Sequence, residues 1–459
     1  MATDIADANA HSSCTQVHIN ESTTEKVNGG TDLEIVGIAD EKSPDLEEGR
    51  ETEEPVDTRT PRQKSVSKLQ FGALCWTLTL GGWNDGSTGA LLPRIQRVYD
   101  IPYIILSLIF VFACAGFMAG SILNMYITPR LGFGRTLLFG SALQLIAYCI
   151  QSSAPPYPVF VLGYVISGMG ISLQDAQANG FVASLKYNAI SKMGIVHSAY
   201  GFGLLIAPFV STQFAQQPHW SFHFLVSLGM SLSNTAFQFF MFRFKSLDVC
   251  LEEGGEPPVV RSHSDKGSLF SQVMKNWRIH AVAAFIIVYL GVSVTISGWI
   301  VTYIIAVRGG GPSAGYISAG VSGGIVIGRT GLLWVNKKIG ERKAVFLYAS
   351  ICIGLEIIVW RVPSLIGNAV TICIAGIFLG PMYPLAINQA TRILPAHILT
   401  GAIGWIAGFG QTGSALAPFI TGALASRVGL QVMPPFLIGL TALMIVVWAL
   451  IPNTPYRCA

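Results

Sequence analysis

The sequence predicts an all-α membrane protein with twelve transmembrane helices in two pseudo-symmetric halves of six. Three observations lead to this expectation: an apolar composition, apolar runs of membrane-spanning length, and short motifs that recur between the halves. Hydrophobic residues make up 51% of the 459 residues and charged residues only 12%, and there are 49 glycines. This composition excludes an ordinary soluble domain.

The first 65 residues differ from the rest of the chain. Of the 25 acidic residues, 15 lie within residues 1–57. The segment is rich in Ser, Thr and Glu and has no apolar period, so we expect residues 1–65 to form a disordered, acidic, cytoplasmic tail. It also lacks the apolar core of a signal peptide.

Apolar runs long enough to cross about 30 Å of hydrocarbon recur twelve times, each bounded by charge, Pro or Gly. The predicted spans are 68–92, 102–126, 136–153, 157–184, 191–214, 220–242, 279–305, 314–335, 343–360, 364–391, 398–425 and 433–452. The widest polar interruption follows the sixth span. The expected organisation is therefore an N-terminal half (66–242), a cytoplasmic linker (243–278), a C-terminal half (279–452) and a short cytoplasmic tail (453–459).

The basic residues predict the orientation, because cytoplasmic loops carry an excess of Lys and Arg. With the N-terminus inside, the linker alone places six basic residues on that side, whereas the opposite side holds only Arg94, Arg97, Arg308, Arg361 and Arg427. We therefore expect both termini to be cytoplasmic. The expected location is the plasma membrane, with the vacuolar or another internal membrane as the alternative.

Two motifs recur at an offset of 208 to 210 residues. Gly203–Phe209 in the fifth span (GLLIAPF) matches Gly413–Phe419 in the eleventh (GSALAPF). Pro129–Arg135 (PRLGFGR) matches Lys337–Lys343 (KKIGERK), each in the turn after an even-numbered span. Repeated six-helix halves place a solute site at their interface near the midplane and permit alternating access.

Two acidic residues, Asp85 and Asp175, lie inside apolar spans. A carboxylate at bilayer depth costs about 2.5 to 3.5 kcal/mol on insertion scales, so it usually lines a polar pathway. We interpret Asp175 as the first candidate proton carrier and Asp85 as the second. A structural role remains open for both, and for Asp85 this would be to brace a helix interrupted by neighbouring glycines.

Amide side chains near the two acids suit a polyhydroxylated or otherwise hydrogen-bonding solute. In the fourth span Asn179 follows Asp175 by four positions and shares its helix face. Trp83, Trp299 and Tyr383 could stack on a sugar ring, although membrane aromatics also serve as anchors at the interface. The candidate solute-binding residues are Asn84, Gln174, Gln177, Asn179, Trp83, Trp299, Tyr383, Asn388 and Gln389.

The basic candidates are of two kinds. Arg329 is the one basic residue deep enough to act as a counter-ion, either for a solute carboxylate or for an aspartate, with an interhelical clamp as the alternative. Arg130, Arg135, Lys338 and Arg342 lie in the short turns, where they can hold helix C-termini and anionic lipid.

No motif supports an enzyme. The sequence has no Gly-Lys-Ser/Thr phosphate loop, no His/Cys metal spacing and no nucleophile motif. The eight cysteines are scattered without a CxxC pair, so neither a metal site nor a disulfide framework is expected. We expect a monomer that contacts a small solute and the lipid bilayer and binds no nucleic acid, with a proton gradient in place of a cofactor.

The order of the landmarks resembles the major facilitator superfamily, and more narrowly the fungal members of its fucose-permease-like branch, over residues 70–452. The landmarks are Gly82–Gly86, Gly89–Pro93, His197–Gly203, Gly298–Thr302, Gly323–Arg329 and Gly380–Pro384. The resemblance implies the superfamily fold, with spans one, four, seven and ten around a cavity. It also implies that Asp175 corresponds to the span-four acid of fucose:proton symporters.

Two departures from that family pattern affect the expected mechanism. Pro129 and Lys337 stand where the family usually has an acid before the first basic residue of the turn, and Ser293 stands where fungal relatives commonly have an acid. Proton symport of a sugar-like solute remains the first expectation. The alternatives are an uncoupled facilitator, an exporter of another organic solute, and a transport-dead nutrient receptor or sensor.

Overall fold

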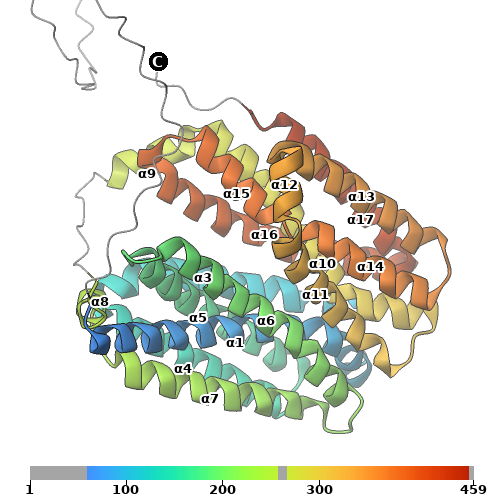
Figure 1. Ribbon diagram of the computed structural model, residues 1–459. Coiled ribbons are helices and arrows are strands. Elements are labelled where there is room, and N and C mark those ends of the chain that lie inside the picture. Colours follow the sequence, from blue (N-terminus) through green and yellow to red (C-terminus); the bar gives the residue numbers. More distant parts are fainter. Residues whose placement is uncertain (1–58, 257–265, 454–459) are drawn as a thin grey trace, which may run out of the picture. The chain divides into compact units, whose positions relative to one another are not determined.

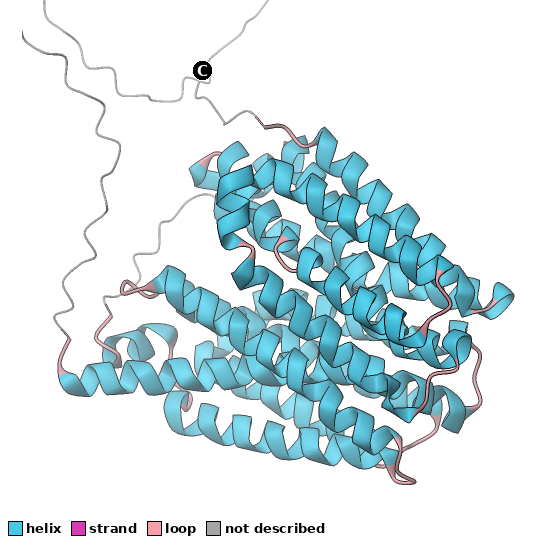
Figure 2. Ribbon diagram, turned by 45° about the vertical axis from the view of Figure 1, so that its right-hand side comes forward, coloured by secondary structure: helices cyan, strands magenta, loops and turns pink. Residues whose placement is uncertain are grey.

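The computed structural model describes residues 59–256 and 266–453, which belong to one compact unit (Figure 1). Most of the predicted acidic tail (1–58) and of the C-terminal tail (454–459) lies outside the described residues. Within the described ranges the chain forms helices joined by short turns and contains no strand (Figure 2). The predicted all-α class is confirmed.

The N-terminal half follows the first six predicted spans. Its elements are α1 (Pro61–Tyr99), α2 (Tyr103–Leu106), α3 (Leu108–Leu131), α4 (Phe133–Ser152), α5 (Tyr157–Ala183), α6 (Ala189–Ala215), η1 (Trp220–Phe222) and α7 (His223–Phe242). The linker carries α8 (Leu247–Glu253) and α9 (Lys266–Lys275).

The C-terminal half follows the other six. Its elements are α10 (Trp277–Arg308), η2 (Pro312–Gly315), α11 (Tyr316–Gly331), α12 (Leu333–Ile339), α13 (Glu341–Arg361), α14 (Leu365–Leu379), α15 (Met382–Ile393), α16 (Ala396–Val428), η3 (Leu430–Val432) and α17 (Met433–Leu450). The eighth span bends by 53° between α11 and α12. The tenth span breaks at Gly380 and Pro381, because proline removes a backbone donor from the helix.

In the described part of the chain, nine helices are long and apolar enough to cross a membrane, or ten if the bent α11–α12 pair counts as one span. The helices α1 and α16, of 39 and 33 residues, fall outside this criterion. Both are rich in glycine, hydroxyl and amide side chains, which lower their hydropathy. They are also central to the packing between the halves.

One predicted boundary is wrong: α1 begins at Pro61, so the last residues of the expected tail are helical. The side chain of Thr60 accepts from the Gln63 backbone NH at 3.3 Å, and Gln63 Oε1 accepts from the Thr60 backbone NH at 2.9 Å. This capping box, with proline at the first helical position, starts the helix before its apolar stretch begins.

Close helix packing repeats between the halves at an offset of 208 residues. Between α3 and α5, a Cβ added to Gly116 would lie 2.1 Å from the carbonyl oxygen of Val165. Between α11 and α14, a Cβ added to Gly324 would lie 2.3 Å from the carbonyl oxygen of Cys373. Only glycine allows the backbones to approach this closely.

The recurring Gly-x-x-x-Ala-Pro-Phe motif has the same packing role in both halves. A Cβ at Gly203 in α6 would lie 2.0 Å from the carbonyl oxygen of Thr79 in α1. A Cβ at Gly413 in α16 would lie 1.9 Å from the carbonyl oxygen of Ile287 in α10. The repeat found in the sequence is therefore also a structural repeat.

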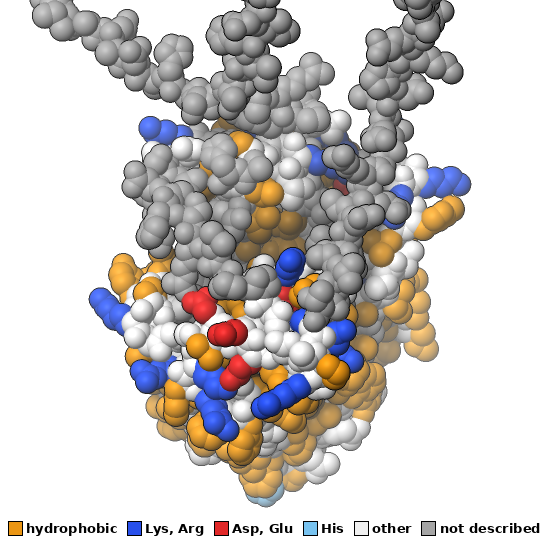
Figure 3. All heavy atoms as spheres, turned by 60° about the vertical axis from the view of Figure 1, so that its left-hand side comes forward, with side chains coloured by type: hydrophobic (Ala, Val, Ile, Leu, Met, Phe, Trp, Pro, Cys, Tyr) orange, Lys and Arg blue, Asp and Glu red, His pale blue; other side chains and the backbone are white. Residues whose placement is uncertain are grey.

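The two halves contact each other from the middle of the bundle to one end. The Ile104 backbone NH donates to Ser426 Oγ at 2.7 Å, and a Cβ at Gly89 would lie 2.1 Å from the carbonyl oxygen of Ser297. We call the other end, where α8 lies, the α8 end; the sequence predicts that it faces the cytoplasm. Figure 3 shows a recess between the halves on this face, which we call the central recess.

Candidate functional site

Asp85 lies near the closed floor of the central recess. Its side chain is exposed, although its helix neighbours Trp83 and Gly86 are buried. One turn further along α1, Gly89 meets Ser297 of the other half. Helix α1 runs without a break past the neighbouring glycines, so Asp85 does not cap an interrupted helix.

The partners of Asp85 are neutral donors. The hydroxyl of Tyr200 in α6 donates to Oδ2 at 2.5 Å, and Asn84 Nδ2 donates to Oδ1 at 3.3 Å. The Tyr148 hydroxyl in turn donates to Asn84 Oδ1 at 3.3 Å. Among residues 59–256 and 266–453, no basic nitrogen lies within 4.0 Å of this carboxylate.

Asp175 and Asn179 lie on α5 as the spacing predicted, and both are partly exposed. Asn179 Nδ2 donates to Asp175 Oδ1 at 3.0 Å, while Asn179 Oδ1 is buried and has no hydrogen-bond partner among the described residues. Asp175 interacts electrostatically with Asp85. The structure therefore brings the two predicted proton carriers into one region of the N-terminal half.

Arg329 supplies a positive charge from the C-terminal half. It is partly exposed on α11, and its Nε donates to the Gly380 carbonyl oxygen at 3.3 Å. Its guanidinium interacts electrostatically with Tyr289 of its own half and with Tyr200 and His197 of the other half. The described ranges contain no carboxylate oxygen within 4.0 Å of it.

Tyr383 is the predicted aromatic candidate that lies between the charged groups. Its ring packs at a tilt against Tyr289, with centroids 6.1 Å apart, and remains partly exposed. It interacts electrostatically with Asp175 of the opposite half and with Arg329 of its own half.

The two tryptophan candidates are instead buried between helices, each bonded to a residue of its own half. Trp83 is buried, donates from Nε1 to Ser227 Oγ at 2.8 Å and stacks on His223 with ring centroids 5.4 Å apart. Trp299 is also buried, and its Nε1 donates to the Pro418 carbonyl oxygen at 3.0 Å. Neither ring is available to a solute in this conformation.

The two glutamine candidates on α5 are likewise buried between helices. Gln177 Nε2 donates to Asn124 Oδ1 at 2.6 Å and to Thr128 Oγ1 at 2.8 Å, which ties α5 to α3. Gln174 Nε2 lies 3.5 Å from Gln238 Oε1 in α7. Both amides therefore satisfy polar groups inside the N-terminal half.

The amide candidates on α15 lie near the α8 end. Asn388 is exposed, and its Nδ2 lies 3.4 Å from Glu341 Oε1 at the start of α13. Gln389 is buried and donates to the Pro452 carbonyl oxygen at 2.8 Å. Asn388 is thus exposed beside the start of α13, and Gln389 ties α15 to the segment that follows α17.

The predicted basic turns lie at helix ends. Arg342 donates from Nη1 to the Ile451 carbonyl oxygen at 2.5 Å and from Nη2 to the Ala449 carbonyl oxygen at 3.2 Å. It therefore binds the last carbonyl groups of α17, where a cation also complements the helix dipole.

The other turn residues are exposed. The Arg135 guanidinium lies 6.0 Å from the ring centroid of Phe244, and Lys338 Nζ lies 4.9 Å from that of Trp334. Arg130 is exposed at the end of α3.

Tyr200 and Tyr289 were not predicted as site residues. Tyrosine in an apolar span is common, and its position along one helix does not reveal a carboxylate on the next. The available signal was the Tyr200-Gly201-Phe202-Gly203 sequence, because small residues beside a tyrosine permit close approach to another helix.

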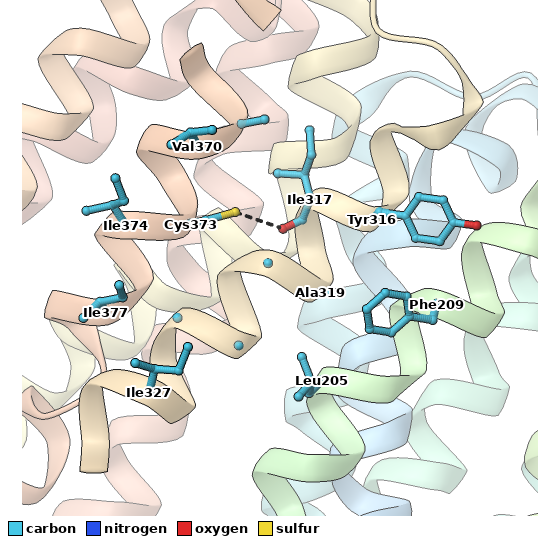
Figure 4. Close-up of a pocket in the computed structure, with 14 residues that line it drawn as sticks. Leu205, Phe209, Tyr316, Ile317, Ala319, Ile327, Val370, Cys373, Ile374 and Ile377 are labelled. Carbon is cyan, nitrogen blue, oxygen red and sulfur yellow. Dashed lines mark hydrogen bonds between the residues drawn. The ribbon is translucent and has the colours of Figure 1, made fainter. Parts of the chain in front are cut away.

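An apolar groove of about 650 Å³ lies apart from this site, at the seam between the halves (Figure 4). Leu205 and Phe209 come from α6, and the other side comes from α11 and α14. None of the described residues that line it is charged, so it does not suit a polar solute.

Two curated relatives cover most of this chain. A Saccharomyces cerevisiae protein named bypass of stop codon protein 6 is 26% identical over 414 residues, which is 84% of this chain and 83% of the relative. A glucose/galactose transporter of Brucella abortus is 24% identical over 400 residues, which is 83% of this chain and 93% of the relative.

Three solved structures share the fold. The first is a bacterial homologue of the human lysosomal transporter spinster in an inward-facing, unoccupied conformation, with a TM-score of 0.70, 13% identity, and coverage of 87% of this chain and 100% of that one. The second is a D-xylose-proton symporter, with a TM-score of 0.67, 12% identity and coverage of 85% and 98%. The third is the Escherichia coli fucose:proton symporter, with a TM-score of 0.58, 16% identity and coverage of 84% and 100%.

The family model for the Major Facilitator Superfamily matches residues 74–373. This match covers more than half of the chain, and the fold agrees with it. The chain belongs to the major facilitator superfamily, a family of membrane transporters rather than enzymes.

Proposed function

We propose that this transporter carries a small, polar, sugar-like solute by alternating access, and that Asp175 and Asp85 couple its movement to protons. One observation carries the proposal: two carboxylates from the N-terminal half lie at the central recess, and their hydrogen-bond partners are neutral. A carboxylate without a fixed counter-ion can exist in either protonation state, whereas a salt-bridged one is held ionised.

The geometry supports a cycle of proton binding and reorientation. Asp85 lies one turn from the contact between Gly89 and Ser297 that closes the recess. Rocking of the halves about such a contact would move both acids between solvent on one side and solvent on the other. A proton bound before this movement and released after it would travel with the solute.

The relatives support the solute class. The fold neighbours include proton symporters of D-xylose and fucose, and a relative of low identity is a glucose/galactose transporter. Because the superfamily fold hosts many solutes, these names support a sugar-like solute by analogy.

An uncoupled facilitator is the second candidate, and Ser293 favours it. This α10 residue interacts with Tyr289 and is partly exposed. If an acid at this position carries the proton in fungal relatives, the serine here would leave solute movement independent of the gradient.

The purified protein reconstituted in liposomes tests the proposal. Labelled neutral and acidic sugars are presented with and without an inward proton gradient. Uptake that rises with the gradient supports symport, and gradient-independent uptake supports the facilitator. Absence of sugar uptake in both conditions contradicts the proposal and favours the exporter or sensor alternatives.

A further inference from the structure

The two sides of the central recess carry opposite charge. The N-terminal half contributes the carboxylates of Asp85 and Asp175. The C-terminal half contributes the guanidinium of Arg329. Tyr200 links the two sides, because its hydroxyl binds Asp85 at 2.5 Å and it interacts electrostatically with Arg329.

The packing of α6 against α11 places Arg329 at the interface of the halves. A Cβ at Gly201 would lie 3.2 Å from Val326 Cγ2, so the two helices touch at this level. The helices run in opposite directions there. His197, four residues before Gly201, and Arg329, three after Val326, both lie one turn closer to the α8 end, where the recess opens.

Within residues 59–256 and 266–453, no carboxylate neutralises Arg329 within 4.0 Å. A guanidinium has five N–H donors. Its described hydrogen bond is to the Gly380 carbonyl oxygen, which is uncharged. A cation held among membrane-spanning helices is costly and usually pairs with an anion or serves a pathway.

We propose that Arg329 binds a carboxylate on the transported solute, which would make the solute a sugar acid rather than a neutral sugar. This inference rests on the proposed function and names its substrate class. A guanidinium binds a carboxylate through two parallel hydrogen bonds, which a lysine cannot reproduce. The hydroxyl groups of the same solute would meet Asp85, which is exposed, and Asn84, which is partly exposed.

The experiment compares matched pairs of sugars in proteoliposomes. D-Glucose and D-glucuronate, and D-galactose and D-galacturonate, differ only in the carboxylate at one carbon. We expect the catalytic efficiency of wild-type uptake to be at least about tenfold higher for each acid than for its neutral partner, because a bidentate charged contact is gained.

The variant Arg329→Gln should lower uptake of the acids by about ten- to a hundredfold and change neutral-sugar uptake by less than about threefold. Arg329→Lys keeps the positive charge but lacks the planar guanidinium. Its uptake of the acids should therefore lie between that of the wild type and that of Arg329→Gln. Arg361→Gln is the matched control, since it removes an exposed positive charge at the far end of α13. If Arg329→Gln gives no folded protein, two other measurements test the inference: the preference of the wild type for acids over neutral sugars, and the uptake of the acids by Arg329→Lys.

The outcomes separate this inference from the proposed function. Uptake of neutral sugars without uptake of the acids overturns the inference and leaves the function standing. If the wild type transports neither class, the thermal melting of the purified protein with D-glucuronate decides. A stabilisation that Arg329→Gln abolishes supports the carboxylate site without transport, and no stabilisation of the wild type overturns both.

Discussion

The hydroxyl of Tyr200 in α6 donates to the carboxylate of Asp85 in α1 at 2.5 Å. The same tyrosine also fixes the distance between the two helices, because a Cβ at Gly82 would lie 1.9 Å from the Tyr200 carbonyl oxygen. The close packing of the α1 and α6 backbones therefore keeps the Tyr200 hydroxyl within hydrogen-bond distance of the Asp85 carboxylate. The hydrogen bond and the glycine contact can be tested separately.

Tyr200→Phe removes the hydroxyl and keeps the ring. Because a hydrogen bond to a charged group contributes about 1.5 to 3 kcal/mol, we expect proton-driven uptake to fall by about tenfold or more. Initial rates in proteoliposomes with a pH gradient measure this. Tyr126→Phe, on an exposed position of α3, is the control, and equal rates for both variants would contradict the role of Tyr200.

Gly82→Ala should prevent correct packing of α1 on α6, because the new methyl group meets backbone rather than a flexible side chain. The readouts are the yield of monodisperse protein and its melting temperature. Gly72→Ala lies on the same helix with no atom within 4 Å of the added Cβ and should be neutral or stabilise by up to about 1 kcal/mol. Similar behaviour of the two variants would show that the α1–α6 contact is looser than described.

Trp83→Phe removes the donor to Ser227 but retains an aromatic ring against His223. We expect a loss of stability of about 1 to 3 kcal/mol, since Ser227 Oγ loses its donor and keeps only its own donation to the His223 carbonyl oxygen. The KM for the transported solute should stay within about twofold, because a residue that does not touch solute leaves solute affinity unchanged. A large rise in KM without a change in melting temperature would instead return Trp83 to the binding site.

Glu256→Gln should loosen the α8 end of the N-terminal half. The buried carboxylate of Glu256 accepts from Arg59 Nη1 at 3.0 Å and from the Lys186 backbone NH at 2.7 Å. Losing the charge should cost about 1.5 to 3 kcal/mol locally. Amide hydrogen exchange around Lys186 should accelerate, and unchanged exchange would show that the contact contributes little.

The control for that variant is Glu252→Gln, an exposed carboxylate on α8. It removes the same charge from the same segment and should leave exchange around Lys186 as it is in the wild type.

The sequence predicted the parts of the site whose chemistry conflicts with a bilayer. Asp85, Asp175 and Arg329 stand out because charge inside an apolar span is costly, and their roles in transport stay predictions. Asn179 followed from helix periodicity alone. Such residues can be identified without knowing which helices are neighbours.

The sequence could not separate packing from binding among uncharged polar side chains. Gln177 donates to residues of α3, and Trp83 donates to a residue of α7. These contacts depend on how the helices pack together, and spacing along the chain does not reveal which helices are neighbours. Tyr200 was missed for the same reason, since its partner is on another helix. The capping box that starts α1 was visible in the sequence, but a hydropathy pattern does not detect it.

The most direct test of the central claim compares wild-type protein with Asp175→Asn in the same liposomes. Two quantities are measured: accumulation of solute driven by an inward proton gradient, and counterflow exchange of solute at equal pH. The account predicts that Asp175→Asn loses accumulation and retains exchange, because the cavity still reorients while the proton site is gone. Asp100→Asn, at an exposed helix cap where asparagine tolerates the positive φ of 49°, should behave as wild type. Normal gradient-driven accumulation by Asp175→Asn would contradict the account.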